Sequence, residues 1–140
     1  MVKNKQAIEE LLDKLHNTAA HGDFKGYMSC YSPKAVFVGT DATEYWSIRE
    51  FASICRRAFQ NGKGWTYTVK RRVVTVGKGG THAWFYEELD NVGYVHARGS
   101  GIVQKVALRW VVMQYVLSFP VPNILAKSLA RQVKKIKKLR

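Results

Sequence analysis

The chain has 140 residues, 46% of them hydrophobic, and its 23 Lys and Arg against 10 Asp and Glu give a net charge of +13. This length and composition are typical of one globular domain with its own core and exclude a disordered chain. No run approaches the ~18 apolar residues of a membrane span, and no apolar export signal opens the chain, so we expect a soluble, cytoplasmic protein. Cys30 and Cys55 belong to no metal-type motif and are expected to be reduced.

Helical periodicity dominates the first part of the chain. Apolar residues at three- and four-residue spacing predict a helix over residues 4–20 and a short second helix from residue 24. A short apolar strand is expected at residues 35–38. Ser47 and Glu50 have the spacing of a capping box, in which each side chain binds the other residue's backbone amide, so a third helix is expected to begin there.

From Trp65 onward the apolar period changes from 3.6 to two, which indicates strands. Pro120 and Pro122 end this region. The alternation predicts four long strands, over residues 65–73 (with a bulge near Arg71), 82–89, 94–104 and 110–119. Helices first and strands later are typical of an α+β fold, with the helices packed on one face of a curved antiparallel sheet.

The last segment carries a disproportionate share of the charge. Residues 127–140 hold seven basic residues and no acid, which leaves 16 basic and 10 acidic residues in the rest of the chain. Asn123 is placed to cap a final amphipathic helix. Its apolar stripe consists of Leu125, Leu129, Val133, Ile136 and Leu139. We therefore divide the chain into a domain over residues 1–122 and a basic helix over 123–140. That helix either docks on the domain or makes weak, non-specific contact with a polyanion, nucleic acid or an acidic membrane.

Several segments with this order of elements resemble the SnoaL-like branch of the NTF2-like superfamily. They are "GTDATEYW" (39–46), "GKGWTYT" (62–68), "AWFYEELD" (83–90), "RGSG" (98–101) and "QYVLSFPVPN" (114–123). The resemblance implies a cone, in which a strongly bent sheet wraps around the first helix and leaves a pocket, and dimers that form through the sheet. The superfamily includes steroid isomerases, polyketide cyclases, dehydratases, epoxide hydrolases and modules without chemistry, so the fold alone does not give the function.

The sequence departs from the pattern of this branch at three places. Tyr86 stands where an acid is expected, and Val116 where relatives often carry His or Asn. Residues 105–109 lack the Gly or Asp of the usual turn. We interpret the first two departures as a loss of polar groups from strands that line the pocket.

The stretch from Trp84 to Gly101 places acids and an arginine on either side of a turn-like cluster, residues 90–93. With the loop centred on Val92 and Gly93, Glu87 pairs with Arg98. The pair is either part of an active site, with Arg98 binding a substrate carboxylate or enolate, or a cross-strand salt bridge. A slip of one residue would bring Glu88 toward Arg98 and turn every side chain to the other face.

Asp41 and Glu44 follow the first strand, where the resemblance implies the general base of the steroid isomerases. The alternatives are a turn residue and a surface acid. The expected pocket walls are aromatic: Trp46, Trp65, Tyr67, Trp84 and Tyr115. The four histidines have no metal-type spacing, and the glycine cluster at 77–80 lacks the context of a phosphate loop, so we predict no metal and no cofactor.

Two functions remain open at this point. The first is a small-molecule-binding protein with an apolar cone pocket, with isomerase, cyclase or dehydratase chemistry on an apolar carbonyl compound. Its polar contacts would be Asp41, Glu44, Glu87 and Arg98. The second is a non-catalytic dimerisation or binding module whose basic tail contacts an anionic partner. A homodimer is expected in either case, because strand 110–119 is apolar on both faces.

Overall fold

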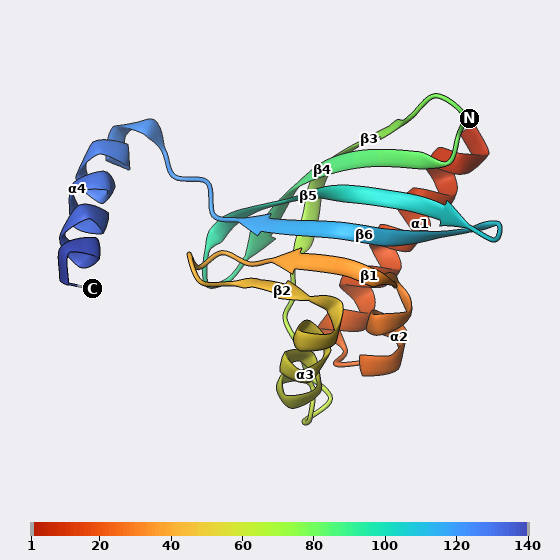
Figure 1. Ribbon diagram of the computed structural model, residues 1–140, viewed down its shortest axis with the longest axis horizontal. Coiled ribbons are helices and arrows are strands. Elements are labelled where there is room, and N and C mark those ends of the chain that lie inside the picture. The colour runs from red at the N-terminus through yellow and green to blue at the C-terminus, as the bar shows by residue number, and fades with distance from the viewer. Residues whose placement is uncertain (1, 140) are drawn as a thin grey trace.

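The computed structural model describes residues 2–139 (Figure 1). The elements are, in chain order, α1 (Val2–Ala20), α2 (Phe24–Ser29), β1 (Tyr31–Val38), β2 (Tyr45–Ser47), α3 (Ile48–Ala58), β3 (Thr68–Val76), β4 (His82–Asn91), β5 (Val95–Val106), β6 (Arg109–Ser118) and α4 (Asn123–Leu139). The predicted order of helices and strands is confirmed. The differences are that β1 begins at Tyr31, that β3 begins at Thr68, and that a short β2 precedes α3.

The strands form one six-stranded sheet in the order β2-β1-β6-β5-β4-β3. Neighbouring strands are antiparallel except for β1 and β6, which run parallel. The sheet curves around α1, and α2 and α3 cover the same concave side (Figure 1). The predicted α+β architecture, with helices in a strongly bent sheet and an added C-terminal helix, is confirmed.

The first helix packs on the concave face because its apolar residues recur on one side. Ile8, Leu12, Leu15 and Ala19 are all at most 3% exposed. Gly22, with φ of 64°, allows the chain to turn sharply after the helix. The capping box predicted at the start of α3 is present: the Glu50 amide donates to Ser47 Oγ over 3.2 Å, and the Ser47 amide donates to Glu50 Oε1 over 3.2 Å.

Two irregularities in the sheet decide which side chains face α1. The bulge predicted in β3 is present, between Val69 and Arg71, and it places Arg72 opposite Glu87. A second irregularity in β6 makes Val112 the partner of Val103 and Gln114 the partner of Ile102. This shift breaks the simple alternation expected along β6, so that Trp110, Val112 and Tyr115 all lie in the hydrophobic core.

The hairpin between β4 and β5 has a different register from the predicted one. Asn91 pairs with Val95 across a three-residue loop, which shifts the register by one residue. Arg98 therefore lies opposite Glu88, and its Nε donates to Glu88 Oε1 over 2.9 Å. The predicted Glu87–Arg98 pair is wrong. The real pair is a cross-strand salt bridge whose side chains are 49% and 37% exposed.

The two departures from the family pattern that we interpreted as losses from the pocket lie on the other face of the sheet. Tyr86 and Val116 are both paired with Ser100, on the outer face of the sheet, so neither removes a polar group from the concave side. The turn between β5 and β6 consists of Ala107 and Leu108, with φ of 49° and 67°. Positive φ at both central residues is the geometry of a type I′ hairpin turn, here without Gly or Asn.

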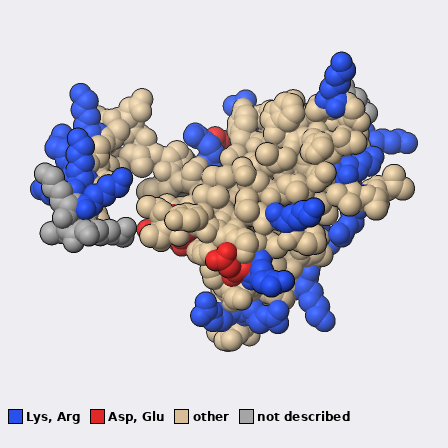
Figure 2. Space-filling model, viewed as in Figure 1, with Lys and Arg blue, Asp and Glu red and all other residues tan. Residues whose placement is uncertain are grey.

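The C-terminal helix stands away from the rest of the molecule (Figure 1). Every residue from 123 to 137 is exposed, including Leu125, Leu129, Val133 and Ile136 of the predicted apolar stripe. Figure 2 shows Lys and Arg gathered over the same helix. Within residues 2–139, no helix has the length and apolar character needed to cross a bilayer.

Candidate active site

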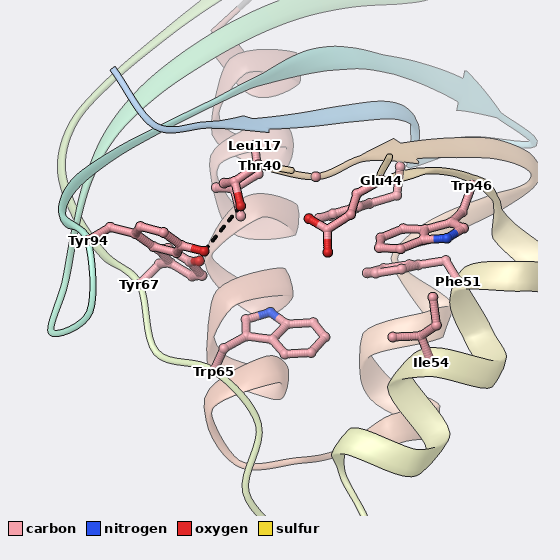
Figure 3. Close-up of a pocket in the computed structure, with 11 residues that line it drawn as sticks. Thr40, Glu44, Trp46, Phe51, Ile54, Trp65, Tyr67, Tyr94 and Leu117 are labelled. Carbon is pink, nitrogen blue, oxygen red and sulfur yellow. Dashed lines mark hydrogen bonds between the residues drawn. The ribbon is translucent and has the colours of Figure 1, made fainter. Parts of the chain in front are cut away.

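A pocket of about 200 Å³ opens between α3, the β1–β2 connection and the segment that leads into β3 (Figure 3). Its lining is mostly aromatic, with a few polar groups, which is the usual character of a ligand site. The lining residues are Phe37, Gly39, Thr40, Glu44, Trp46, Phe51, Ile54, Trp65, Tyr67, Tyr94 and Leu117. Glu44, Trp46, Trp65 and Tyr67 are thus the sequence-predicted site residues that line it.

The carboxylate of Glu44 is held at the pocket by its own loop. Its Oε1 accepts from the Asp41 amide over 3.0 Å, and the Glu44 carbonyl accepts from the Gly39 amide over 2.7 Å. A Cβ at position 39 would lie 2.6 Å from Glu44 Oε1, so glycine leaves the space that this side chain occupies. Asp41 is exposed, does not line the pocket, and accepts from the Thr43 amide in a turn.

Tyr67 is the second polar group of the pocket. Burial, assisted by the nearby Tyr94 and Glu44, raises the pKa of its hydroxyl. The phenol therefore stays protonated at neutral pH and is available as a hydrogen-bond donor. A carboxylate and a neutral hydroxyl, set among Trp46 and Trp65, face the same apolar space (Figure 3).

The mouth of the pocket is bordered by the β4–β5 hairpin loop. Tyr94 and Thr40 share a hydrogen bond of 3.2 Å between their hydroxyls, which joins this loop to the β1–β2 connection (Figure 3). Asn91 holds the loop in place: its Oδ1 accepts from the Gly93 amide over 2.8 Å, and its Nδ2 donates to the Thr66 carbonyl over 2.9 Å. Asn91 thereby fixes the loop of Tyr94 against the segment of Trp65 and Tyr67.

Behind the pocket lies a buried cluster of polar side chains centred on Glu87, which is fully buried. Glu87 Oε1 is 2.6 Å from His16 Nε2 and accepts from the Tyr115 hydroxyl over 2.6 Å. Glu87 Oε2 accepts from Arg72 Nε over 2.7 Å. These four residues come from α1, β3, β4 and β6, so the cluster ties the first helix to the sheet.

Arg72 also reaches two acids of α1. Its Nη1 lies 3.2 Å from Glu9 Oε1 and 2.8 Å from Asp13 Oδ1, and its side chain is only 7% exposed. Within the described part of the chain, the Arg72 Nη2 atom is buried and has no hydrogen-bond partner. Three carboxylates around one guanidinium keep it charged, and the charges of Glu87 and Asp13 raise its pKa although burial opposes this.

The electrostatics of the cluster favour an ionised Glu87. Burial alone would raise the pKa of this carboxyl, but hydrogen bonds from His16 and Tyr115 and the charge of Arg72 outweigh it and lower the pKa. The same arrangement raises the pKa of Tyr115, mainly through burial and then through the Glu87 charge. Glu87 is therefore an acceptor, and Tyr115 donates to it.

Two inward-facing glycines create the space for this cluster and explain the "RGSG" segment. Gly99 pairs with Glu87 and Gly101 with Phe85, both on the concave side of the sheet. A Cβ at Gly99 would overlap the Tyr115 hydroxyl, at the position from which it reaches Glu87. Arg98, by contrast, points to the outer face.

The other predicted wall residues divide between the two faces. Tyr115 is 2% exposed and belongs to the core and to the Glu87 cluster. Trp84 is 54% exposed on the outer face, so it does not line the pocket. In residues 2–139, no group of three or more His, Cys, Asp or Glu is arranged to hold a metal ion.

Two members of the cluster were not predicted from the sequence as site residues. Arg72 reads as one of three consecutive surface bases, and only the exact position of the bulge turns it inward. His16 lies one position after Leu15 on the apolar side of α1, at the edge of the buried face. In the sequence, the position of His16 beside the apolar stripe of this helix was the one signal that a polar side chain lies inside the cone.

Comparison with known proteins supports the assignment of the fold. The fold is shared with solved structures of low sequence identity, among them an NTF2-like protein of unknown function from Pseudomonas putida (11% identity, 88% of this chain and 91% of that chain, TM-score 0.73). Another is a putative aromatic ring hydroxylase from Novosphingobium aromaticivorans (15% identity, 87% and 92%, TM-score 0.70). A third is a domain of unknown function with a cystatin-like fold from Nostoc punctiforme (14% identity, 99% and 95%, TM-score 0.71).

These similarities define the class as an NTF2-like α+β cone. The model of the SnoaL-like domain matches residues 8–122, so the chain belongs to the SnoaL-like family. No curated protein matches the sequence.

Proposed function

We propose that this protein binds a small, largely apolar molecule with a carbonyl or hydroxyl group and catalyses proton transfer on it, as an isomerase, cyclase or dehydratase does. The observation that carries the proposal is the aromatic pocket of about 200 Å³ that holds one carboxylate, Glu44, and one neutral phenol, Tyr67. Aromatic walls supply apolar contact, and the two polar groups orient the ligand.

The chemistry follows from the two protonation states. Tyr67 donates a hydrogen bond to the carbonyl oxygen of the ligand and stabilises the negative charge that develops there during enolisation. Glu44, when ionised, accepts a proton from the carbon next to that carbonyl. The aromatic neighbours reduce the access of water and strengthen both interactions.

Binding of 2-naphthol, a fluorescent aromatic alcohol of suitable shape, tests the proposal. We expect saturable binding, which Ile54→Trp weakens at least about tenfold because the larger ring occupies the pocket. Fluorescence titration measures it. Tyr86→Phe, on the outer face, is the matched control and should leave the affinity unchanged. Absence of binding in the parent protein, or equal binding by Ile54→Trp, would contradict the pocket as the ligand site.

A second candidate function rests on the exposed surfaces and not on the pocket. We infer a non-catalytic module in which two copies pair through the outer face of the sheet and α4 lies on an anionic membrane surface. A row of side chains on that face, Trp84, Ile102, Gln114 and Val36, crosses four strands and leaves three apolar residues 39–54% exposed. A second copy would cover this row.

The helix supports a membrane surface over nucleic acid as its partner. At about 100° per residue, the apolar residues Leu125, Leu129, Val133 and Ile136 fall on one side of α4. Most of the basic residues lie on the opposite side, and Lys137 borders the stripe next to Val133. A basic amphipathic helix with an uncovered apolar stripe suits an acidic bilayer, since the stripe enters the headgroup region while the bases face phosphates. A nucleic acid would bind the basic residues through its phosphates and leave the apolar stripe exposed to water.

Two matched variants distinguish these partners. Leu129→Glu is expected to weaken binding to phosphatidylserine-containing vesicles at least about tenfold, while Ser128→Glu, with the same change of charge beside the stripe, has a much smaller effect. Vesicle co-sedimentation at low and high salt measures this, and light scattering gives the molar mass. Equal effects of the two variants on DNA binding, with no vesicle binding, would favour nucleic acid. A monomeric molar mass would contradict the pairing of two copies through the outer face of the sheet.

A further inference from the structure

The buried cluster touches the ligand pocket through a small chamber. This chamber, of about 10 Å³, is lined by His16 and Tyr115, and it shares Phe37, Trp65, Tyr67 and Leu117 with the pocket. Its volume is about that of one water molecule or one hydroxyl group. His16 and Tyr115 are therefore the members of the Glu87 cluster that border the space next to the ligand pocket.

The contacts of Glu87 determine which nitrogen of the imidazole faces the carboxylate. Because Glu87 is ionised and already accepts from the Tyr115 hydroxyl and from Arg72 Nε, the 2.6 Å contact with His16 Nε2 requires that this nitrogen carry the proton. A neutral imidazole protonated at Nε2 has its lone pair at Nδ1. No hydrogen bond to His16 Nδ1 is formed among residues 2–139.

We propose that His16 is a catalytic base of the pocket, with Glu87 as the positioning residue that fixes its tautomer. His16 Nδ1 takes the proton of a ligand hydroxyl, directly or through one water molecule in the chamber. The O–H electron pair stays on the ligand oxygen, which becomes an oxyanion. The imidazolium so formed lies against the ionised Glu87, and the proton returns when the ligand is reprotonated.

The fold supports this role more strongly than a purely structural one. A structural ion pair between Arg72 and Glu87 would be complete with the Tyr115 hydroxyl and needs no imidazole at the chamber. The rings of Trp46, Phe51, Phe37 and Tyr115 stack in sequence, with successive planes within 17° of parallel, from the pocket to the cluster. These rings form a continuous aromatic wall from the pocket to Tyr115, whose ring centroid is 6.2 Å from that of His16. The proposal rests on the proposed ligand pocket.

Bound 2-naphthol reports directly on the proton, because naphthol and naphtholate have different absorption and emission spectra. In the parent protein at neutral pH we expect part of the bound ligand to be naphtholate. In His16→Gln, whose amide can still donate to Glu87, we expect affinity within about threefold of the parent and loss of the naphtholate signal, since Gln accepts no proton. His21→Gln, which changes an exposed histidine shortly after α1, is the matched control and should behave as the parent.

The outcomes separate the two proposals. Failure of 2-naphthol to bind overturns the proposed pocket function. Binding with naphtholate absent in the parent, or equally present in His16→Gln, overturns the role of His16 and leaves the pocket intact. Nitrogen-15 NMR of the parent protein gives an independent readout that requires no variant to fold. It should show His16 protonated at Nε2 and unprotonated at Nδ1, and the opposite tautomer would overturn the proposal.

Discussion

Arg72→Met is expected to lower the free energy of unfolding by about 3–5 kcal/mol, the usual cost of removing one partner of a buried ion pair. Glu87 is fully buried, and Arg72 is the permanent cation in contact with it. Without Arg72, the carboxylate has to remain charged in an apolar interior or take up a proton, and both are unfavourable. The contacts of Arg72 with Glu9 and Asp13 are lost as well. Urea denaturation followed by circular dichroism measures the change.

Arg71→Met is the matched control, because Arg71 is the adjacent residue in the same strand and is exposed. It should change the free energy of unfolding by no more than about 0.5 kcal/mol. Equal effects of the two substitutions would mean that the Arg72–Glu87 pair contributes no more than an ordinary surface charge.

The same cluster gives the stability a defined dependence on acid. The pKa of Glu87 lies below its usual value of 4.5 in the folded protein, so its ionisation contributes stability that is fully present above that pH. This contribution is lost as the pH falls below 4.5 and toward the lowered pKa. Glu87→Gln should therefore flatten this part of the profile of stability against pH, in addition to lowering stability at neutral pH.

Patterns that repeat along the chain were sufficient to predict most of the fold. The apolar face of α1, the capping box at Ser47 and the alternation of the long strands each depend on several residues, so one unusual residue does not change the interpretation. The resemblance and the abundance of aromatic residues then predicted Glu44, Trp46, Trp65 and Tyr67, which line the observed pocket. The same reasoning also predicted Asp41, Trp84 and Tyr115, which do not line it.

Single-residue events in the sheet were not predictable in the same way. A three-residue loop in place of a two-residue loop at Asn91 moves Arg98 from Glu87 to Glu88. Because side chains alternate between faces, one residue of register turns a proposed active-site pair into a surface salt bridge. The loop length depends on the Asn91 side chain accepting from the amides of Gly93 and Tyr94, a contact that alternation does not encode.

The candidate site likewise has one part that the sequence predicts and one part that it does not. Its apolar walls follow from composition and resemblance, whereas the centre at Glu87 depends on residues that meet only in three dimensions. His16 and Glu87 are separated by 71 positions, and Arg72 reaches them through a bulge. Neither the spacing nor the charge pattern of the sequence distinguishes Arg72, whose side chain is buried, from the neighbouring Lys70 and Arg71, which are exposed.

Gly101→Ala is expected to lower the free energy of unfolding by about 3 kcal/mol, at the upper end of the usual cost of overpacking. Gly101 faces inward in β5, between Phe85 and Tyr115 on the adjacent strands, and a Cβ there would overlap the backbone oxygen of Gln114. A backbone oxygen in a paired strand cannot move aside as the end of a side chain can, so β5 and β6 would have to separate locally.

Ser100→Ala, one position away in the same strand and facing the opposite side, is the matched control and should cost less than about 0.5 kcal/mol. Thermal and urea denaturation of the two variants measure the difference. Because Gly101 pairs directly with Tyr115, separation of these strands would also move the Tyr115 hydroxyl away from Glu87. The Gly101→Ala protein should therefore lose the acid-dependent part of its stability together with part of its stability at neutral pH. A variant as stable as the parent would show that the strands adjust without cost, and that the small residues of this segment are not what holds Tyr115 against Glu87.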